Sequence, residues 1–167
     1  NRFSKEGSQL YDVIEPGFKF NMLDIQAAIG LHQLDELEQF IEKRTMLAMR
    51  YFQQLRDISE IALPVLPSYN FKHNWHLFTI LIKPHCGITR DTFIKEMKEQ
   101  NIGTGLHYQP PHLFSYYQKT YSFKKNDFPA AERVGDSIVS LPLFPDMTEK
   151  EQDRVIAAIK KIFSRRK

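Results

Sequence analysis

The strongest constraint on the fold is a stripe of apolar residues, three or four apart, in the first third of the chain. Such spacing places side chains on one face of a helix, so it predicts a long helix, or two helices in line, against a core. The members of the stripe are Ala27, Gly30, Leu34, Leu37, Ile41, Ala48, Phe52 and Leu55. Asn21 and Asp24 approximate a capping box at its start, and Pro64 and Pro67 end the helical pattern.

Other apolar residues at the start of this helix lie off the stripe. Met22, Ile25, Ile29 and Leu31 are too many for a face that meets only water. We therefore expect the beginning of the helix to dock on another domain or on a partner.

Strand and helix patterns alternate in the middle of the chain. A β-branched and aromatic run predicts a buried strand over 75–82. Thr89 is a helix cap, and the helix that follows it ends near 101–103, where Asn and Gly tolerate left-handed geometry. A short strand is expected over 102–108.

The last third carries more turn signals. We expect a long, partly irregular surface segment over 112–128 and a short helix over 130–137. The apolar run 138–145 contains prolines, which favour an edge strand or a turn. A capping box of Thr148 and Glu151 opens a final helix. Helices and strands alternating around one core predict a two-layer α/β domain with a long first helix, a small mixed or antiparallel sheet and a C-terminal helix.

Composition limits the possible partners. The chain has 167 residues, of which 42% are apolar and 26% charged, as in an ordinary globular domain. The net charge is only +3 and the basic clusters lack interleaved aromatic residues, so we expect no nucleic-acid partner. A single cysteine excludes an intramolecular disulfide, and nothing resembles a signal peptide or membrane span. We therefore expect a cytoplasmic protein without membrane contact.

The first residues are polar and include no initiator Met. We interpret the chain as a piece of a longer protein, with 1–20 as linker or loop from a larger domain and 21–167 as a small C-terminal α/β domain.

Patterns for metal or hydrolytic chemistry are weak. His73 and His76 are three residues apart and His85 adjoins Cys86, but no zinc-binding spacing is present, so we expect no metal site. A nucleophile elbow and a glycine-rich phosphate loop are also absent from the sequence.

Lys19 and Asn21 lie in a loop just before the predicted helix. A helix N-terminus favours an anionic group such as phosphate, for which lysine adds charge and asparagine adds a hydrogen-bond donor. The alternative, which residue preferences favour, is that Asn21 only caps the helix and Lys19 only meets solvent.

His107 and Tyr108 end the predicted strand and are followed by Pro110, Pro111 and His112. The prolines stiffen the segment, so an imidazole and a phenol could be held at a fixed place in a cleft. A strand end whose aromatic rim covers the core is an equal alternative. Trp75, His76, Tyr116 and Tyr117 are treated as packing residues.

Three separated segments resemble the C-terminal half of the DegT/DnrJ/EryC1/StrS family of sugar aminotransferases. They are 16–34, 103–112 and the set of matches from Phe128 to Ile156, and they occur in the family's order. The resemblance implies the small α/β domain of a fold-type-I enzyme that uses pyridoxal 5′-phosphate (PLP). It also implies a homodimer with active sites at the subunit interface.

The implied reaction transfers an amino group, usually from glutamate, to a keto group of a nucleotide-linked sugar. The resemblance assigns Lys19 or Asn21 to the cofactor phosphate, and His107, Tyr108 and His112 to the substrate. It places the Schiff-base lysine and the other catalytic groups upstream of this chain, which we expect to be inactive alone. The sugar and the carbon aminated are left open. A non-catalytic dimerisation or interaction module is the alternative, and an RNA-binding domain is a second.

Overall fold

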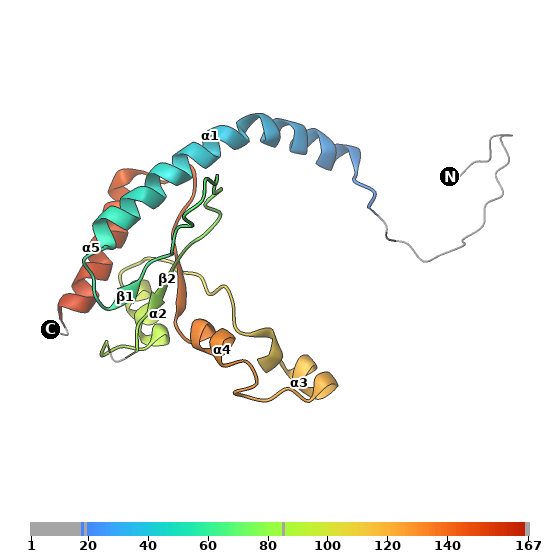
Figure 1. The fold of residues 1–167 in the computed structure, drawn as a ribbon. Helices are drawn as coiled ribbons and strands as arrows, with labels where there is room; N and C mark the ends of the chain where they lie inside the picture. The colour runs from blue at the N-terminus through green and yellow to red at the C-terminus, as the bar shows by residue number, and fades with distance from the viewer. Residues whose placement is uncertain (1–17, 19, 85, 166–167) are drawn as a thin grey trace, which may run out of the picture. The chain divides into compact units, whose positions relative to one another are not determined.

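The computed structural model describes residues 18, 20–84 and 86–165, and its chain divides between Glu36 and Leu37 into two compact units. Its elements, in order, are α1 (Asp24–Leu55), β1 (Ile61–Ala62), β2 (Phe78–Ile82), α2 (Arg90–Glu99), the 3-10 turn η1 (Pro111–Leu113), α3 (Ser115–Tyr121), α4 (Pro129–Gly135), β3 (Ile138–Leu141) and α5 (Glu149–Ser164) (Figure 1). The expected mixed α/β class is confirmed.

The second unit, residues 37–167, contains a three-stranded antiparallel sheet in the order β1-β2-β3. Ile80 pairs with Val139 and Phe78 with Leu141, so these side chains share one face. All four are buried, and we call this the core face. Because successive strand residues alternate between faces, Thr79 and Ser140 lie on the opposite side, which we call the second face.

Helices α1, α2 and α5 contribute their buried residues to the cluster that includes the core face. The ring of Tyr51 on α1 lies 4.9 Å from that of Phe78 on β2, and Phe93 on α2 stacks on Phe163 of α5 at 5.8 Å. Each fully buried side chain of this size contributes about 1.5–3 kcal/mol relative to exposure. The core therefore fixes the sheet, and with it the position of the second face.

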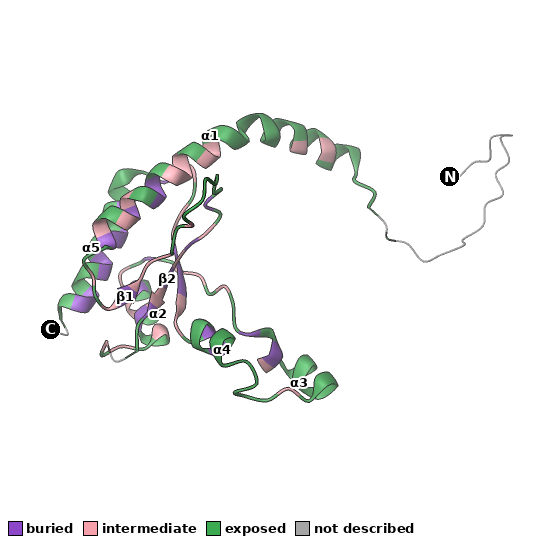
Figure 2. Ribbon diagram, in the orientation of Figure 1, coloured by how far each residue is buried: buried purple, intermediate pink, exposed green. Residues whose placement is uncertain are grey.

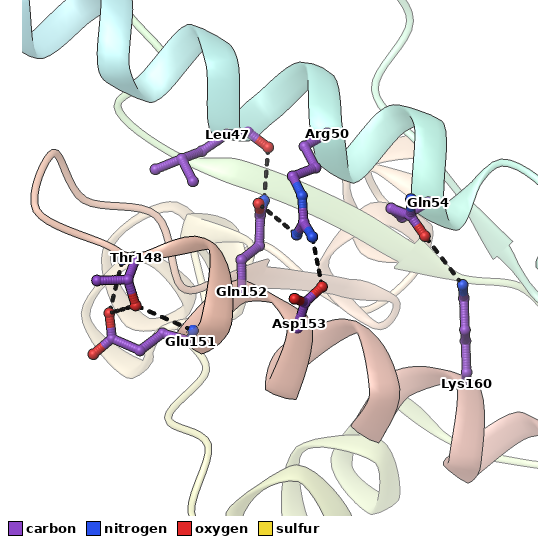
Figure 3. Close-up of polar contacts among 8 residues, drawn as sticks. All are labelled: Leu47, Arg50, Gln54, Thr148, Glu151, Gln152, Asp153 and Lys160. Atoms are coloured by element: carbon purple, nitrogen blue, oxygen red, sulfur yellow. Dashed lines mark hydrogen bonds and ion pairs between the residues drawn. The ribbon is translucent and has the colours of Figure 1, made fainter.

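A buried polar contact joins α1 to α5 (Figure 3). The Gln152 amide nitrogen donates to the Leu47 carbonyl at 2.7 Å, and its oxygen accepts from Arg50 at 3.1 Å. Arg50 also pairs with Asp153 at 2.5 Å. Gln152 is fully buried, so these bonds replace the water that its amide loses on folding.

The start of α1 differs from the predicted capping. The helix begins at Asp24, and the Leu23 N–H donates to Gln26 Oε1 at 3.1 Å. The prediction of Asn21 as cap is therefore wrong, because the residue before the helix is Leu23. The Gln26 side chain, which accepts from the Leu23 N–H, forms only the second half of a capping box.

The core-facing stripe is also shorter than predicted. The buried residues of α1 are Leu47, Ala48, Tyr51 and Leu55, and Figure 2 shows them confined to its second half. Leu34, a predicted core residue, is 66% exposed. Met22, Ile25, Ile29 and Leu31 are between 59% and 74% exposed, which agrees with the expectation that they are not part of this chain's own core.

The predicted strand over 75–82 begins only at Phe78. Trp75 has φ 47°, a left-handed conformation that interrupts an extended chain. Its N–H donates to His73 Nδ1 at 2.8 Å, while its indole is buried against Phe52 and Phe78. Burial of the ring thus offsets the local backbone strain.

Local signals located two helices correctly. Thr89 caps α2, and Thr148 with Glu151 forms the capping box of α5. The expected strand over 102–108 is reduced to one bridge between Gly105 and Ser140. The segment 112–128, expected to be partly irregular, contains α3. Among the described residues, no helix is long and apolar enough to span a bilayer.

Candidate functional site

The segment after α2 pairs with the outer edge of β3. Asn101 has φ 57°, and the Ile102 N–H donates to the Met97 carbonyl at 3.0 Å, which closes the helix. Gly105 then exchanges two backbone hydrogen bonds with Ser140, of 2.9 and 2.8 Å. Residues 102–105 are thereby attached to β3.

His107 is fixed by a side chain of β3. Its Nδ1 lies 2.8 Å from Ser140 Oγ, on the second face. A Cβ atom on Gly105 would lie 2.6 Å from His107 Cε1, so the glycine is what allows the ring to reach Ser140. Since Nδ1 is engaged, Nε2 is the ring nitrogen available for another partner.

Tyr108 is the projecting residue of the segment. Its side chain is 72% exposed and contacts the His107 ring edge-on at 4.8 Å. Within the described part of the chain its hydroxyl has no hydrogen-bond partner. The structure therefore brings together two of the predicted site residues, an anchored imidazole and an exposed phenol.

Pro110 is the next residue of this segment that packs on another element, and it is buried against α4. A Cβ on Gly135 would lie 2.4 Å from Pro110 Cδ, so only glycine permits this approach. The Gly135 carbonyl accepts from Arg90 Nη1 at 2.8 Å. This contact ties α4 to the start of α2.

His112 has a different setting from His107. Its ring is 6% exposed, and Nε2 lies 2.9 Å from Glu132 Oε1. The same oxygen accepts from the N–H groups of Asn126 at 2.7 Å and Phe128 at 3.4 Å. Burial raises the pKa of Glu132, but the hydrogen bonds from His112 and the two N–H groups outweigh it and hold the pKa below its usual range. A substrate-facing role for His112 stays a prediction.

Between His112 and Glu132 the chain carries a series of touching aromatic rings. Tyr117 stacks on Tyr121, which stacks on Phe123, and Phe128 contacts both Phe123 and the ring of His112. Tyr116 and Tyr117, expected to be packing rather than site residues, are exposed, and their rings contact each other edge-on at 5.3 Å. The aromatic series is therefore partly exposed to solvent.

The other predicted site lies in the first unit, residues 1–36. Asn21 is exposed, and Lys19 lies outside the described residues. Asp24 adds a carboxylate to the first turn of α1. An asparagine amide here can donate to one phosphate oxygen. Phosphate binding by either residue stays a prediction.

The described lysines do not supply a cofactor amine. A Schiff-base lysine must be desolvated or placed beside other cations. Every described lysine is exposed except Lys43, which is half-buried and 3.9 Å from Asp146. The residues described here thus do not by themselves form a PLP site, although Asn21 fits a contributory phosphate contact.

The described residues also form no cluster of candidate metal ligands. In the part of the chain that the structure describes, no three His, Cys, Asp or Glu side chains are grouped to hold an ion. The Cys86 thiol lies 3.4 Å from the Ile88 carbonyl, and His85 is outside the described residues.

Ser140, Glu132 and Gly135 support the site but were not predicted as site residues. Ser140 and Glu132 lie within segments that carry the family resemblance, and this resemblance is the signal in the sequence that could have identified them. Their partners are 33 and 20 residues away in the sequence, so no local pattern pairs them.

Comparison with curated proteins finds relatives along almost the whole chain. The chain is 43% identical over 164 residues to the uncharacterised protein MJ1066 of Methanocaldococcus jannaschii, covering 98% of this chain and 42% of that protein. It is 39% identical to the spore coat polysaccharide biosynthesis protein SpsC of Bacillus subtilis, covering 97% and 42%. It is 40% identical to the UDP-4-amino-4-deoxy-L-arabinose–oxoglutarate aminotransferase of Shewanella sediminis, covering 90% and 40%. The chain thus spans about two fifths of the length of these relatives.

Solved structures share the fold. An aminotransferase of Brucella abortus matches with a TM-score of 0.77 at 30% identity, covering 95% of this chain and 40% of that one. The PLP-form of Spr1654 from Streptococcus pneumoniae matches with a TM-score of 0.82 at 27% identity, again covering 95% and 40%. The model of the DegT/DnrJ/EryC1/StrS aminotransferase family matches residues 2–160, and the chain belongs to that family.

Proposed function

We propose that this chain is the C-terminal part of a PLP-dependent enzyme that transfers an amino group, from glutamate, to a keto group of a nucleotide-linked sugar. The match of the family model to residues 2–160 is the observation that carries the proposal. The name of the Shewanella relative, which contains both UDP and oxoglutarate, supports a nucleotide sugar and a glutamate donor.

We propose that the residues of the active site are divided between this chain and another part of the enzyme, and the lysines of this chain support that division. Among the described residues the lysine amines are solvated or ion-paired, which supports a Schiff-base lysine supplied by another part of the enzyme. PLP, when bound, supplies the electron sink. From this chain, Lys19 or Asn21 contributes to binding the cofactor phosphate of the neighbouring subunit in a homodimer.

His107 and Tyr108 contribute on the substrate side. The bond to Ser140 orients the imidazole of His107, so that Nε2 accepts from or donates to a sugar hydroxyl or a phosphate oxygen. The exposed phenol of Tyr108 supplies a second hydrogen-bonding group beside it. We further propose that the enzyme acts in the cytoplasm.

The proposal is tested first by reading the gene upstream of the codon for Asn1. An encoded cofactor domain with a suitable lysine supports the enzyme, whereas a native start codon near Asn1 favours the interaction module. The isolated chain, mixed with PLP, should show no stable aldimine absorption beyond that of free amines. It should also fail to convert a keto sugar nucleotide with glutamate.

The contrary result would be a borohydride-trapped adduct at one lysine of this chain together with measurable transamination. That outcome would place the active site within these residues and overturn the proposed division of labour.

A further inference from the structure

We propose that Glu132 is a positioning residue that closes the segment 112–132 into a fixed loop and thereby holds Tyr108 in place for the sugar nucleotide. The inference rests on the proposed function for its substrate. Its structural part concerns only contacts within residues 37–167.

The first observation is the convergence of three contacts on one oxygen. Glu132 Oε1 meets the His112 ring and the N–H groups of Asn126 and Phe128. The side chains of Glu132 and His112 are both almost fully buried, at 8% and 6% exposure. A carboxylate oxygen forms stronger bonds to such donors than a neutral acceptor does. Glu132 therefore joins the start of the loop to its end.

The end of the loop has a geometry that needs this acceptor. Asn126 has φ 77°, and the Lys124 N–H donates to Asp127 Oδ2 at 2.8 Å. This turn points the Asn126 N–H toward Glu132. If the carboxylate were lost, this part-buried N–H would lose its partner, which carries a cost.

The second observation links the loop to Tyr108. Helix α4 holds the segment 108–112 at two places, through Gly135 against Pro110 and through Glu132 against His112. Both residues between Gln109 and His112 are prolines, whose φ angles are fixed. The backbone between His112 and Pro110 therefore has few free dihedral angles, and only Gln109 separates this stiff pair from Tyr108.

The third observation is that the residue before Tyr108 is held by a contact that does not involve Glu132. His107 is attached to β3 through Ser140, and Tyr108 follows it directly. The exposed phenol thus lies between an anchor on β3 and an anchor on α4. Glu132 belongs to the second anchor without itself reaching the exposed site.

Lysines within the loop allow its opening to be measured by limited trypsin proteolysis of the 167-residue chain. Lys119, Lys124 and Lys125 are exposed trypsin sites within the loop, and Lys160 on α5 is a reference site. Glu132→Gln should raise cleavage at the loop lysines about tenfold, because local opening limits proteolysis there, and leave Lys160 unchanged. Glu99→Gln, an exposed position on α2, is the matched control and should cleave like the unaltered chain.

The kinetic test uses the complete enzyme of the proposed function. Glu132→Gln should raise KM for the sugar nucleotide about tenfold while kcat stays within about twofold, because substrate binding is weakened and the chemistry is not. Glu99→Gln should change neither. Glu132→Asp keeps the negative charge but has a shorter side chain that does not reach the same three donors. It should therefore behave like Glu132→Gln, and it is used in its place if Glu132→Gln does not fold.

The outcomes separate the two claims. An opened loop with an unchanged KM would overturn the positioning role of Glu132 and leave the proposed function standing. An unchanged cleavage pattern would do the same, because it would show that Glu132 does not hold the loop closed. A loss of kcat equal to the loss of kcat/KM would indicate a different role for Glu132. If the unaltered enzyme transaminates no sugar nucleotide, both the proposed function and the inference built on it fail.

Discussion

The Ser140 hydroxyl and the His107 ring meet at 2.8 Å on the second face of the sheet, 33 residues apart in sequence. The backbone of Ser140 pairs with Gly105 at the same place. One residue of β3 therefore holds the segment that carries Tyr108 by both its main chain and its side chain.

Replacing Ser140 by Ala should release the ring of His107. We expect a loss of about 0.5–1.5 kcal/mol in the free energy of unfolding, the net value of one neutral hydrogen bond, measured by urea denaturation. In the complete enzyme the affinity for the sugar nucleotide should also fall. Ser68→Ala, at an exposed position, is the control, and equal stability of both variants would contradict this account.

Gly135→Ala should destabilise the contact between α4 and Pro110. The new Cβ would lie 2.4 Å from Pro110 Cδ, so we expect a cost of about 1–3 kcal/mol from overpacking. Gly103→Ala is the matched control, since nothing lies within 4 Å of its added Cβ. Urea unfolding followed by the fluorescence of Trp75 measures both, and a stable Gly135→Ala chain would show that Pro110 can move away freely.

Tyr51→Phe should weaken the core and alter its response to alkali. The Tyr51 hydroxyl donates to the Pro142 carbonyl at 2.8 Å, so its removal should cost about 1 kcal/mol at neutral pH. Burial raises the pKa of Tyr51 well above its usual 10.0, against a smaller lowering by Arg50. A raised folded-state pKa stabilises the protein below pH 10.0 and loses that contribution as the pH rises through the folded value.

The difference in unfolding free energy between the unaltered chain and Tyr51→Phe should therefore shrink above pH 10.0. Urea titrations at neutral and alkaline pH measure it, and the exposed tyrosines shared by both chains cancel in the comparison. A difference that stays constant with pH would show that Tyr51 ionises as readily in the folded state as in the unfolded one.

Lys19→Ala or Asn21→Ala in the complete enzyme should weaken cofactor retention. A hydrogen bond to a charged phosphate is worth about 1.5–3 kcal/mol, so at least one variant should lose PLP on dialysis. Gln33→Ala, on the exposed face of α1, is a control. Full retention of PLP by both variants would remove these residues from the phosphate site.

The sequence by itself determined the elements whose signals are local. Thr89 with the apolar residues after it specified α2, and Thr148 with Glu151 specified α5, because capping and periodicity act within one or two turns. The mixed α/β class followed from the order of such segments. The segment that contains His107 and Tyr108 was likewise found from its neighbouring prolines and its family resemblance.

Only the tertiary structure decided which faces are covered and which distant groups meet. The periodic stripe of α1 predicted a helix but not that Leu34 is exposed while Leu55 is buried, because periodicity marks a face and not what packs on it. Likewise Glu132 with His112 and Ser140 with His107 depend on how α4, β3 and the segment after α2 are brought together. Such pairings arise from the shared core, whose contacts link residues far apart in the chain and leave no local pattern.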